Sequence, residues 1–510
     1  MRVYVTTPLY YVNAEPHLGH TYTTVAADTL ARWHRGRGDE VIFLTGTDEH
    51  GDKIVQAAAA AGVEPRVHAD RVSQLFRDTW DTCGISYDHF IRTTDAYHVD
   101  TVQDVLRRMQ AAGDIYFGSY GGLYCYGCER FYTEKELVGG LCPDHQTAPA
   151  YIAEENYFFR MSAYQQRLAD ELEAHPDRIM PDRYRNEVLA MLRGDSLGDL
   201  CISRPKTRLT WGIELPFDDR YVAYVWCDAL TNYVSAIRHL HPDAFDAWWP
   251  QAQHLIGKDI VKPHGVFWPT MLMSAGLPLY KGLCVHGYWT RGESKMSKSL
   301  GNVIRPLEMK ARFGMDAFRY FLLREMAFGQ DATFSEDAFV TRVNADLANN
   351  LGNLVSRTLA MQQRYFQGVV QPLGEWSDED RGLAATFADA IAEMPAFIAQ
   401  LAFHRALEAL WRAIDAANKY VVTTAPYTLA KQPATLPRAG AVLHHLLEAL
   451  AVTAVTLTPF LPETSARILA LLDLPAAAGH GPWGERLADG HVTQKPEILF
   501  PRIETDAKET

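Results

Sequence analysis

The chain has 510 residues, a length that corresponds to about three domains of roughly 150 residues each. Apolar residues make up 47% of the sequence and charged residues 22%, a balance that excludes intrinsically disordered and fibrous proteins. The formal net charge of −13 argues against nonspecific coating of nucleic acid, so any nucleic-acid partner must meet a locally basic surface.

The cysteine content and the N-terminal sequence bear on the cellular compartment. Seven cysteines are too few for a disulfide scaffold, and their odd number indicates reduced thiols and predicts a cytoplasmic protein. The sequence MRVYVTTPLYYVN has the pattern of neither a signal peptide nor a transit peptide. The most apolar stretch, residues 449–462, has the length of a buried helix, so no membrane partner is expected.

The N-terminal part of the chain alternates strand-like and helical segments, which is the order of an α/β protein. Its first helix, residues 17–34, carries a buried apolar stripe, with Asp28, Arg32 and Arg35 expected to face solvent. The predicted strands are residues 3–5, 41–45 and 89–93, and the further helices are residues 52–61, 65–83 and 99–112.

The pattern changes twice further along the chain. Residues 114–220 form short Gly- and Tyr-rich elements with one charged helix at residues 163–173, which predicts an insertion between two halves of a sheet, residues 1–113 and 221–290. Residues 291–345 contain a basic loop with the sequence KMSKS, and residues 346–510 predict a helical bundle. The α/β segments of the second half are residues 221–226, 254–256 and 283–286, and the bundle helices are residues 345–366, 378–396, 400–422, 436–458 and 463–472.

Two basic motifs lie at opposite ends of the predicted α/β domain. His17, Gly19 and His20 follow the first strand and open the first helix, where imidazole donors and a backbone without Cβ suit a polyphosphate. Lys295 and Lys298 of KMSKS present two ammonium groups to anionic oxygens. Taken alone, the histidines are more often structural, and the lysines more often belong to a solvated loop.

A third motif lies in the predicted insertion. Cys125 and Cys128 form one pair with two residues between them, and Cys142 and His145 form a second pair with the same spacing. Two such pairs are typical of a tetrahedral structural Zn²⁺ knuckle, in which protein ligands fill all four positions and none is left for catalysis. The alternative for these residues is a disulfide or idle thiols.

Together and in this order, the two basic motifs resemble the signature pair of class I aminoacyl-tRNA synthetases. The first is usually written His-Ile-Gly-His in that family, and Leu18 takes the place of the isoleucine here. The segments PLYYVNAEPHLGH, TGTDEHGDKI, YVWCDALTNYVSA, LIGKDIVKPHGVFWPTMLM and VHGYW extend the resemblance to methionyl-tRNA synthetases over nearly the whole chain. The resemblance implies an α/β fold with a Rossmann-type doubly wound parallel sheet, a zinc-knuckle insertion and an all-α helical domain.

The resemblance also implies the reaction and its partners. The methionine carboxylate would attack the α-phosphorus of ATP to give methionyl-adenylate and pyrophosphate, and the 3′ end of tRNA(Met), including initiator tRNA, would then take the acyl group. Catalysis by positioning and charge stabilisation would fall to His17, His20, Lys295 and Lys298, with Mg²⁺ bound alongside ATP. The ATP site would also include Gly19, Lys258, Asp259 and Ser297.

The implied methionine site has aromatic walls, which suit a thioether because each sulfur–aromatic contact contributes about 0.3–1.5 kcal/mol. Asp48 would accept the substrate ammonium group. Without the motifs, Trp226 and Tyr233 could equally form a core stripe. The implied methionine-binding residues are Tyr11, Asp48, Trp226, Ala229, Leu230, Tyr233 and His286.

The helical domain would bind the anticodon, and residues 291–345 would contact the tRNA stem. Asn353 and Arg357 lie four residues apart on one predicted helix face and resemble the anticodon-reading pair of the family. Their third partner is usually a tryptophan, and Tyr427 takes its place in the sequence Ala-Pro-Tyr. A tyrosine can still stack on a splayed base. The chain ends at Thr510 without room for the additional tRNA-binding domain of dimeric relatives, so a monomer is expected.

Three alternatives stay open on the sequence alone. Another class I synthetase without an editing domain would share both motifs, and the predicted insertion is too short for the hydrolytic domain of the Ile, Leu and Val enzymes. A nucleotidylyltransferase would share the phosphate site but would not need the helical domain. A zinc-containing RNA-binding module would need neither basic motif.

Overall fold

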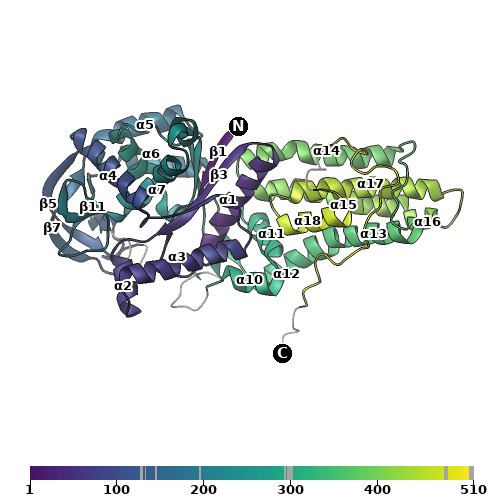
Figure 1. Ribbon diagram of the computed structural model, residues 1–510, viewed down its shortest axis with the longest axis horizontal. Coiled ribbons are helices and arrows are strands. Elements are labelled where there is room, and N and C mark those ends of the chain that lie inside the picture. Colours follow the sequence, from purple (N-terminus) through teal and green to yellow (C-terminus); the bar gives the residue numbers. More distant parts are fainter. Residues whose placement is uncertain are drawn as a thin grey trace. The chain divides into compact units, whose positions relative to one another are not determined.

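The computed structural model describes residues 1–126, 130–132, 134–143, 146–194, 197–291, 294–295, 303–475 and 481–504 (Figure 1). The chain divides into two compact units, Met1–His286 and Gly287–Thr510. The first unit is built on a parallel sheet covered by helices, and the second consists mainly of helices. The α/β class and the helical C-terminal domain predicted from the sequence are therefore confirmed.

The sheet of the first unit has seven strands, and every pairing in it is parallel. From β1 the chain moves to β3 and β4 on one side and later to β13 and β14 on the other, so the strand order reverses between β1 and β13. Across the sheet the strands follow the order β4 (His89–Arg92), β3 (Glu40–Asp48), β1 (Arg2–Thr6), β13 (Ala252–Gly257), β14 (Gly282–His286) and β8 (Ile179–Met180), while the short β2 (Tyr10–Tyr11) pairs with the end of β3.

The central strands are apolar on both faces because helices cover both sides of the sheet. In β1 and β13, Val3, Val5, Leu255 and Ile256 are almost completely buried. The strand β8 lies within the stretch predicted as an insertion and extends the sheet at its edge. The helices of this unit are α1 (Leu18–Gly36), α2 (Asp52–Ala60), α3 (Pro65–Thr82), α4 (Ala96–Ala111), α5 (Gln165–Ala174), α6 (Asp182–Arg193), α7 (Val225–Leu240), α8 (Phe245–Trp248) and α9 (Trp268–Ser274).

One expectation for α1 is wrong. Asp28 does not face solvent but is fully buried. Its carboxylate accepts hydrogen bonds from the amide and hydroxyl groups of Ser86 at 2.8 and 2.6 Å, and from Arg32 at 2.8 Å. Because these donors replace water, the carboxylate joins the loop after α3 to the middle of α1.

Residues 115–223 contain two small antiparallel sheets in addition to α5, α6 and the strand β8 of the parallel sheet. The segment predicted at residues 221–226 divides between two elements, because β12 ends at Ala223 and α7 begins at Val225, so Trp226 lies on a helix. One sheet contains β6 (Arg130–Tyr132), β5 (Ile115–Cys125), β7 (Ala150–Phe159) and β9 (Leu200–Cys201), and the other contains β10 (Ser203–Pro205), β12 (Asp218–Ala223) and β11 (Glu214–Leu215).

The second unit begins with a small three-stranded sheet and continues as a helical bundle. The predicted bundle helices are confirmed to within a few residues, and a π-helical segment, Val343–Gly352, leads directly into α13. The strands are β16 (Ser294–Lys295), β15 (Trp289–Arg291) and β17 (Ala332–Phe334), and the helices are α10 (Pro306–Phe313), α11 (Met315–Glu325), α12 (Glu336–Arg342), α13 (Asn353–Phe366), α14 (Asp378–Ala399), α15 (Phe403–Thr424), α16 (Pro426–Leu429), α17 (Leu436–Leu457) and α18 (Pro462–Leu471).

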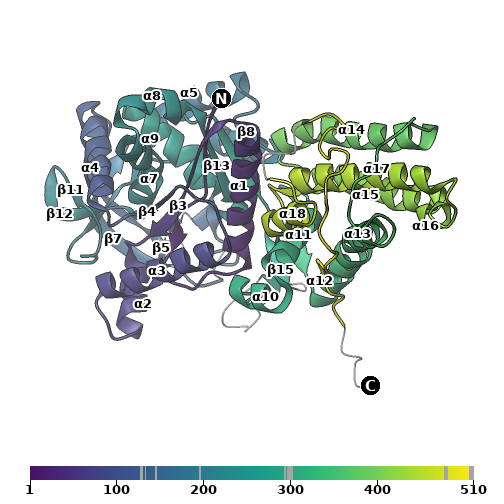
Figure 2. The same ribbon diagram turned by 45° about the vertical axis from the view of Figure 1, so that its right-hand side comes forward.

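Two bundle helices, α14 and α17, are long and apolar enough to cross a membrane by length and composition alone. The most apolar window of α17 is 89% buried inside the protein, against 28% for α14. Both views of the bundle show α17 running alongside α14 and α15 (Figure 2). The helix α17 is thus the central helix of the bundle, and its apolar composition follows from burial on nearly all sides.

Candidate active site

Several predicted site residues of the first unit lie at the carboxyl ends of the parallel strands. In open α/β sheets, ligands bind at this edge, where the strand order reverses. Here the reversal lies between β1 and β13. The start of α1 follows β1 and β2, the pair Lys258 and Asp259 follows β13, and His286 ends β14.

His17 and His20 stack on each other at the start of α1, with ring centroids 3.8 Å apart. His17 is the N-cap of the helix, and its Nδ1 accepts a hydrogen bond from the Gly19 amide at 3.1 Å. The His17 amide in turn donates to Nδ1 of His20 at 3.4 Å. The two rings, which are only partly buried, therefore lie at the positive end of a helix, where an anion is stabilised.

Asp48 ends β3 and is 6% exposed. Its carbonyl accepts a hydrogen bond from the Val12 amide at 3.2 Å. Tyr11 lies beside it on β2, and the Tyr11 hydroxyl donates to the carbonyl of His50 at 2.9 Å. The strand pairing thus brings together two of the predicted methionine residues, which are 37 positions apart in the chain.

The helix α7 carries four predicted methionine residues. Ala229, Leu230 and Tyr233 are at most 7% exposed, and Trp226 is half-buried at the first turn. The Trp226 ring meets the ring of His264 edge to face at 6.0 Å, and the Tyr233 hydroxyl bonds to Nε2 of His264 at 2.8 Å. An aromatic wall is therefore present, and His264 joins its two halves.

Burial sets the protonation state of this wall. It lowers the pKa of His264 to about 4 and raises the pKa of Tyr233 above its usual value. Nδ1 of His264 bonds to the Ile260 carbonyl at 3.0 Å. A neutral imidazole that donates from Nδ1 leaves Nε2 as an acceptor, so the Tyr233 hydroxyl is the donor. The wall is therefore uncharged at neutral pH, as an apolar thioether requires.

His286 is the last predicted methionine residue, and it is 5% exposed. Its Nε2 bonds to the hydroxyl of Thr23 on α1 at 2.7 Å, and its ring meets Tyr22 edge to face at 5.0 Å. A Cβ at Gly257 would lie 2.7 Å from the Asp259 carboxylate and 3.6 Å from the His286 ring. The glycine therefore leaves room for the Asp259 carboxylate beside the end of β13.

The basic loop lies largely outside the described residues. Lys295 belongs to β16 by its backbone, while Ser297 and Lys298 lie outside the part of the chain that the structure describes. Among the predicted zinc ligands, Cys125 and Cys142 are buried and share a small cluster with Tyr132, whose hydroxyl accepts a hydrogen bond from the Cys142 thiol at 3.4 Å. Cys128 and His145 lie outside the described residues, which contain no group of three or more possible metal ligands.

The predicted anticodon residues lie in the second unit. Asn353 is exposed at the first position of α13, and Arg357 is partly exposed one turn later. Tyr427 lies on the short helix α16 and is 41% exposed. The side chains of Asn353 and Arg357 are reachable from solvent on one face of one helix, and Tyr427 belongs to a different element.

Three site contacts were not predicted from the sequence. They are the Thr23–His286 bond, the His264 bridge and the burial of Asp228 between His50 and His98, at 2.7 and 2.8 Å. Burial alone would raise the pKa of Asp228, but the two imidazoles lower it below its usual value. All of these residues except Thr23 and His98 lie inside the segments that carry the resemblance, yet no sequence pattern shows which of them meet.

Comparison with known proteins agrees with this geometry. The family described as tRNA synthetases class I (M) matches residues 3–154 and 145–359, and the family described as the anticodon binding domain of methionyl tRNA ligase matches residues 370–510. The methionine–tRNA ligase of Caldanaerobacter subterraneus is 43% identical over 99% of this chain and 79% of its own length. The Mycobacterium bovis methionine–tRNA ligase is 42% identical over 98% of both chains.

A solved structure is similar over the same extent. Mycobacterium tuberculosis methionyl-tRNA synthetase in complex with methionyl-adenylate gives a TM-score of 0.94 at 42% identity, covering 98% of this chain and 100% of that one. The chain belongs to the methionyl-tRNA synthetase family of class I tRNA synthetases.

Proposed function

We propose that this chain activates methionine with ATP and transfers it to tRNA(Met), including initiator tRNA, as a methionine–tRNA ligase. The observation that carries the proposal is the full-length likeness to a synthetase that holds methionyl-adenylate. The stacked histidines at the start of α1, which follows β1 and β2, and the aromatic contact of Trp226 with His264 support the proposal.

Methionine is proposed to bind between the end of β3 and the first turns of α7. Trp226 and Tyr233 would contact the thioether, and the Asp48 carboxylate would accept the ammonium group. Because the wall carries no charge, it favours a side chain without polar atoms. The full proposed set is Tyr11, Asp48, Trp226, Ala229, Leu230, Tyr233 and His286.

The two basic motifs are proposed to bind ATP. His17 and His20 would donate hydrogen bonds to phosphate oxygens, and Lys295 and Lys298 would stabilise the charge that develops on the departing pyrophosphate. Mg²⁺, bound together with ATP, supplies further charge neutralisation on the phosphates. Further nucleotide contacts are assigned to Gly19, Lys258, Asp259 and Ser297.

A structural Zn²⁺ is proposed at Cys125, Cys128, Cys142 and His145. The two described members support it, since Cys125 and Cys142 are both buried in one small cluster with Tyr132. Two buried sulfur ligands of this kind suit a closed tetrahedral site. Elemental analysis should find about one zinc per chain. Metal-free native protein would contradict the assignment.

The helical domain is proposed to read the anticodon through Asn353, Arg357 and Tyr427. The match to the anticodon binding domain over residues 370–510 supports this role for the bundle.

We further infer a cytoplasmic monomer without a membrane partner, in line with the reduced cysteines. Light scattering of the pure protein tests the monomer directly.

The test of the proposed function is ATP–pyrophosphate exchange with single amino acids. Methionine should support exchange, while isoleucine, valine and leucine should not, because branched side chains do not fit a site shaped for an unbranched one. Comparable exchange with isoleucine would contradict the proposal.

A further inference from the structure

The segment that follows Asp48 is held by buried charges. Residues 49–51 connect β3 to α2, and within them Glu49 is fully buried and His50 is 7% exposed. Glu49 forms an ion pair with Arg92, the last residue of β4. His50 hydrogen-bonds through Nδ1 to Asp228 on α7 at 2.7 Å. The proposed ammonium acceptor is therefore the direct chain neighbour of a buried, charged anchor.

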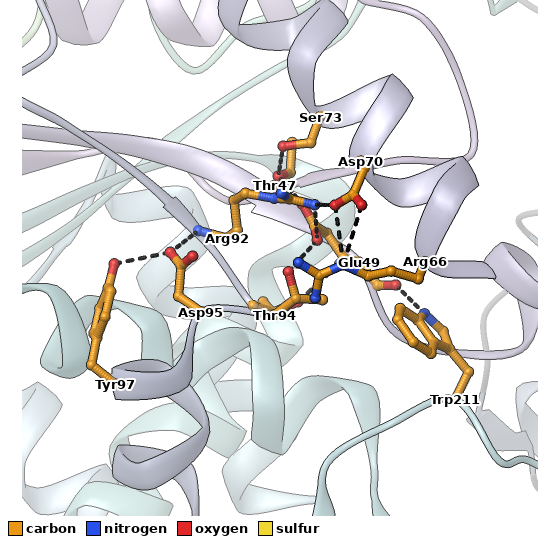
Figure 3. Close-up of polar contacts among 11 residues, drawn as sticks. Thr47, Glu49, Arg66, Asp70, Ser73, Arg92, Thr94, Asp95, Tyr97 and Trp211 are labelled. Carbon is orange, nitrogen blue, oxygen red and sulfur yellow. Dashed lines mark hydrogen bonds and ion pairs between the residues drawn. The ribbon is translucent and has the colours of Figure 1, made fainter. Parts of the chain in front are cut away.

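Every polar group of Glu49 has a partner among the surrounding residues (Figure 3). Its amide donates to the Thr93 hydroxyl at 3.0 Å, and its carbonyl accepts from the Trp211 indole at 2.6 Å. The carboxylate accepts from Nε and Nη2 of Arg92 at 2.7 and 2.8 Å. The hydroxyl groups of Thr47 and Thr94 also donate hydrogen bonds to this carboxylate, at 2.8 and 2.7 Å.

Arg92, at the end of β4, is itself anchored twice. In addition to the two hydrogen bonds with Glu49, Nη2 of Arg92 donates a hydrogen bond to the Asp70 carboxylate on α3 at 2.5 Å. Burial would lower the pKa of Arg92, but Glu49 and Asp70 raise it above its usual value, so the guanidinium stays charged. Arg66 also pairs with Asp70, at 3.1 Å, but its side chain is 52% exposed.

A bidentate guanidinium–carboxylate pair fixes orientation as well as distance. Removing one partner of such a buried pair leaves a charge without compensation, and the backbone must move to bring water or another donor to it. Asp48 shares a peptide unit with Glu49, so any such movement displaces the Asp48 carboxylate. A shift of about 1 Å in a reacting geometry can cost about 100-fold in rate or binding.

We propose that Glu49 and Arg92 are positioning residues of the methionine site, whose ion pair fixes the end of β3 and thereby the Asp48 carboxylate that receives the substrate ammonium group. The inference rests on the proposed role of Asp48. Neither residue touches methionine in this arrangement, and both act through the chain neighbour of Glu49.

The experiment measures exchange kinetics of Arg92→Met, Arg92→Lys and Glu49→Gln in the full chain, normalised by active-site titration. Arg92→Met should raise the methionine KM by about 100-fold while the ATP KM stays within about twofold. Glu49→Gln should also raise the methionine KM, because a neutral amide has only one oxygen and cannot accept a hydrogen bond from Arg92 at both positions. Arg92→Lys keeps the charge and should recover part of the loss.

Arg66→Met is the matched control, because it removes an arginine from the same Asp70 without touching Glu49. Its methionine KM should equal that of the unmodified protein. A merely structural pair would lower the thermal midpoint of Arg92→Met and leave the methionine KM of the titrated enzyme unchanged, which would overturn the proposal. Equal increases in Arg66→Met and Arg92→Met would overturn it as well.

The conservative variants and one further variant, Asp48→Asn, keep the test decisive. If Arg92→Met does not fold, Glu49→Gln and Arg92→Lys carry the comparison, and an unchanged methionine KM in both refutes the positioning role. Asp48→Asn separates this inference from the proposed function. An unchanged methionine KM in Asp48→Asn would remove Asp48 from the substrate site, whereas a large rise there with none in Glu49→Gln would refute the positioning role alone.

Discussion

Two buried carboxylates, one in each unit, are paired with arginine in nearly the same way but lie next to different residues in the chain. Glu49 in the first unit and Asp380 in the second are both fully buried, and each receives two hydrogen bonds from one arginine. Glu49 is next to a proposed substrate ligand. Asp380 caps α14 through Ser377 and bonds to Tyr420 on α15 and Arg438 on α17.

The comparison shows that a buried ion pair does not reveal its role by its own geometry. Both pairs are bidentate and both carboxylates are fully buried, so both pairs hold their elements in one orientation. The role depends on which chain segment carries the carboxylate. Asp380 lies in the first turn of the bundle helix α14, so loss of its ion pair is expected to lower the stability of the protein.

The largest expected effect is therefore in the bundle. Arg438→Met leaves the Asp380 carboxylate buried with no arginine partner, and it should cost about 3–5 kcal/mol of unfolding free energy. Chemical denaturation followed by circular dichroism measures this loss. The methionine KM should stay unchanged in the protein that remains folded, in contrast to Arg92→Met. A raised methionine KM in Arg438→Met would break the comparison.

The second prediction separates chemistry from tRNA recognition within residues 287–510. Lys298→Ala should reduce adenylate formation by about 100- to 1,000-fold, because it removes a charge that acts on the departing pyrophosphate. Arg357→Ala should leave exchange intact and weaken tRNA charging. Pyrophosphate exchange and aminoacylation, measured on both variants, check this. Equal loss of exchange in the two variants would contradict the assignment of roles.

The third prediction concerns the aromatic wall. Trp226→Ala should raise the methionine KM by about tenfold, the equivalent of roughly 1.4 kcal/mol of lost sulfur–aromatic and apolar contact. Its effect should be smaller than that of Arg92→Met, since a wall residue supplies contact and the ion pair fixes geometry. Exchange kinetics at varied methionine and varied ATP distinguish the two. A change confined to the ATP KM would place Trp226 at the nucleotide end of the site.

The smallest expected effect is a pH dependence of bundle stability. Burial lowers the pKa of His445 to about 4, so the unfolded chain binds a proton that the folded chain does not. The stability from this group is present above the ordinary histidine pKa of about 6.5 and falls as the pH drops toward 4. In His445→Gln, the free energy of unfolding measured with urea should depend less on pH between pH 6.5 and pH 4. An unchanged pH profile would mean that His445 does not titrate in this window.

Asp380 extends the same comparison to lower pH. Burial would raise its pKa, but Arg438 and Tyr420 lower it to about 2. A depressed carboxyl pKa contributes stability that is present above the unfolded value of about 3.9 and is lost as the pH falls toward 2. This contribution requires Arg438, so Arg438→Met should weaken the acid dependence in that range.

The sequence by itself determined the order of elements and the chemistry of the motifs. Period-2 and period-3.6 patterns predict strands and helices because each element must bury one face. His17, His20 and the KMSKS lysines are recognisable because, together and in this order, they resemble the signature pair of class I aminoacyl-tRNA synthetases. The resemblance then named the methionine residues, and the full-length similarity confirms the family. The individual site assignments stay predictions.

Only the tertiary structure decided which polar residues became buried partners. Asp28 follows a helical pattern that predicts exposure, yet the Ser86 loop covers it. Glu49 and Arg92 are 43 residues apart, and Thr23 and His286 are 263 apart. The sequence pattern does not show that a charged residue will be buried. The cost of desolvating such a residue is offset by hydrogen-bond donors that folding brings from distant segments. Only the folded chain shows where those donors are.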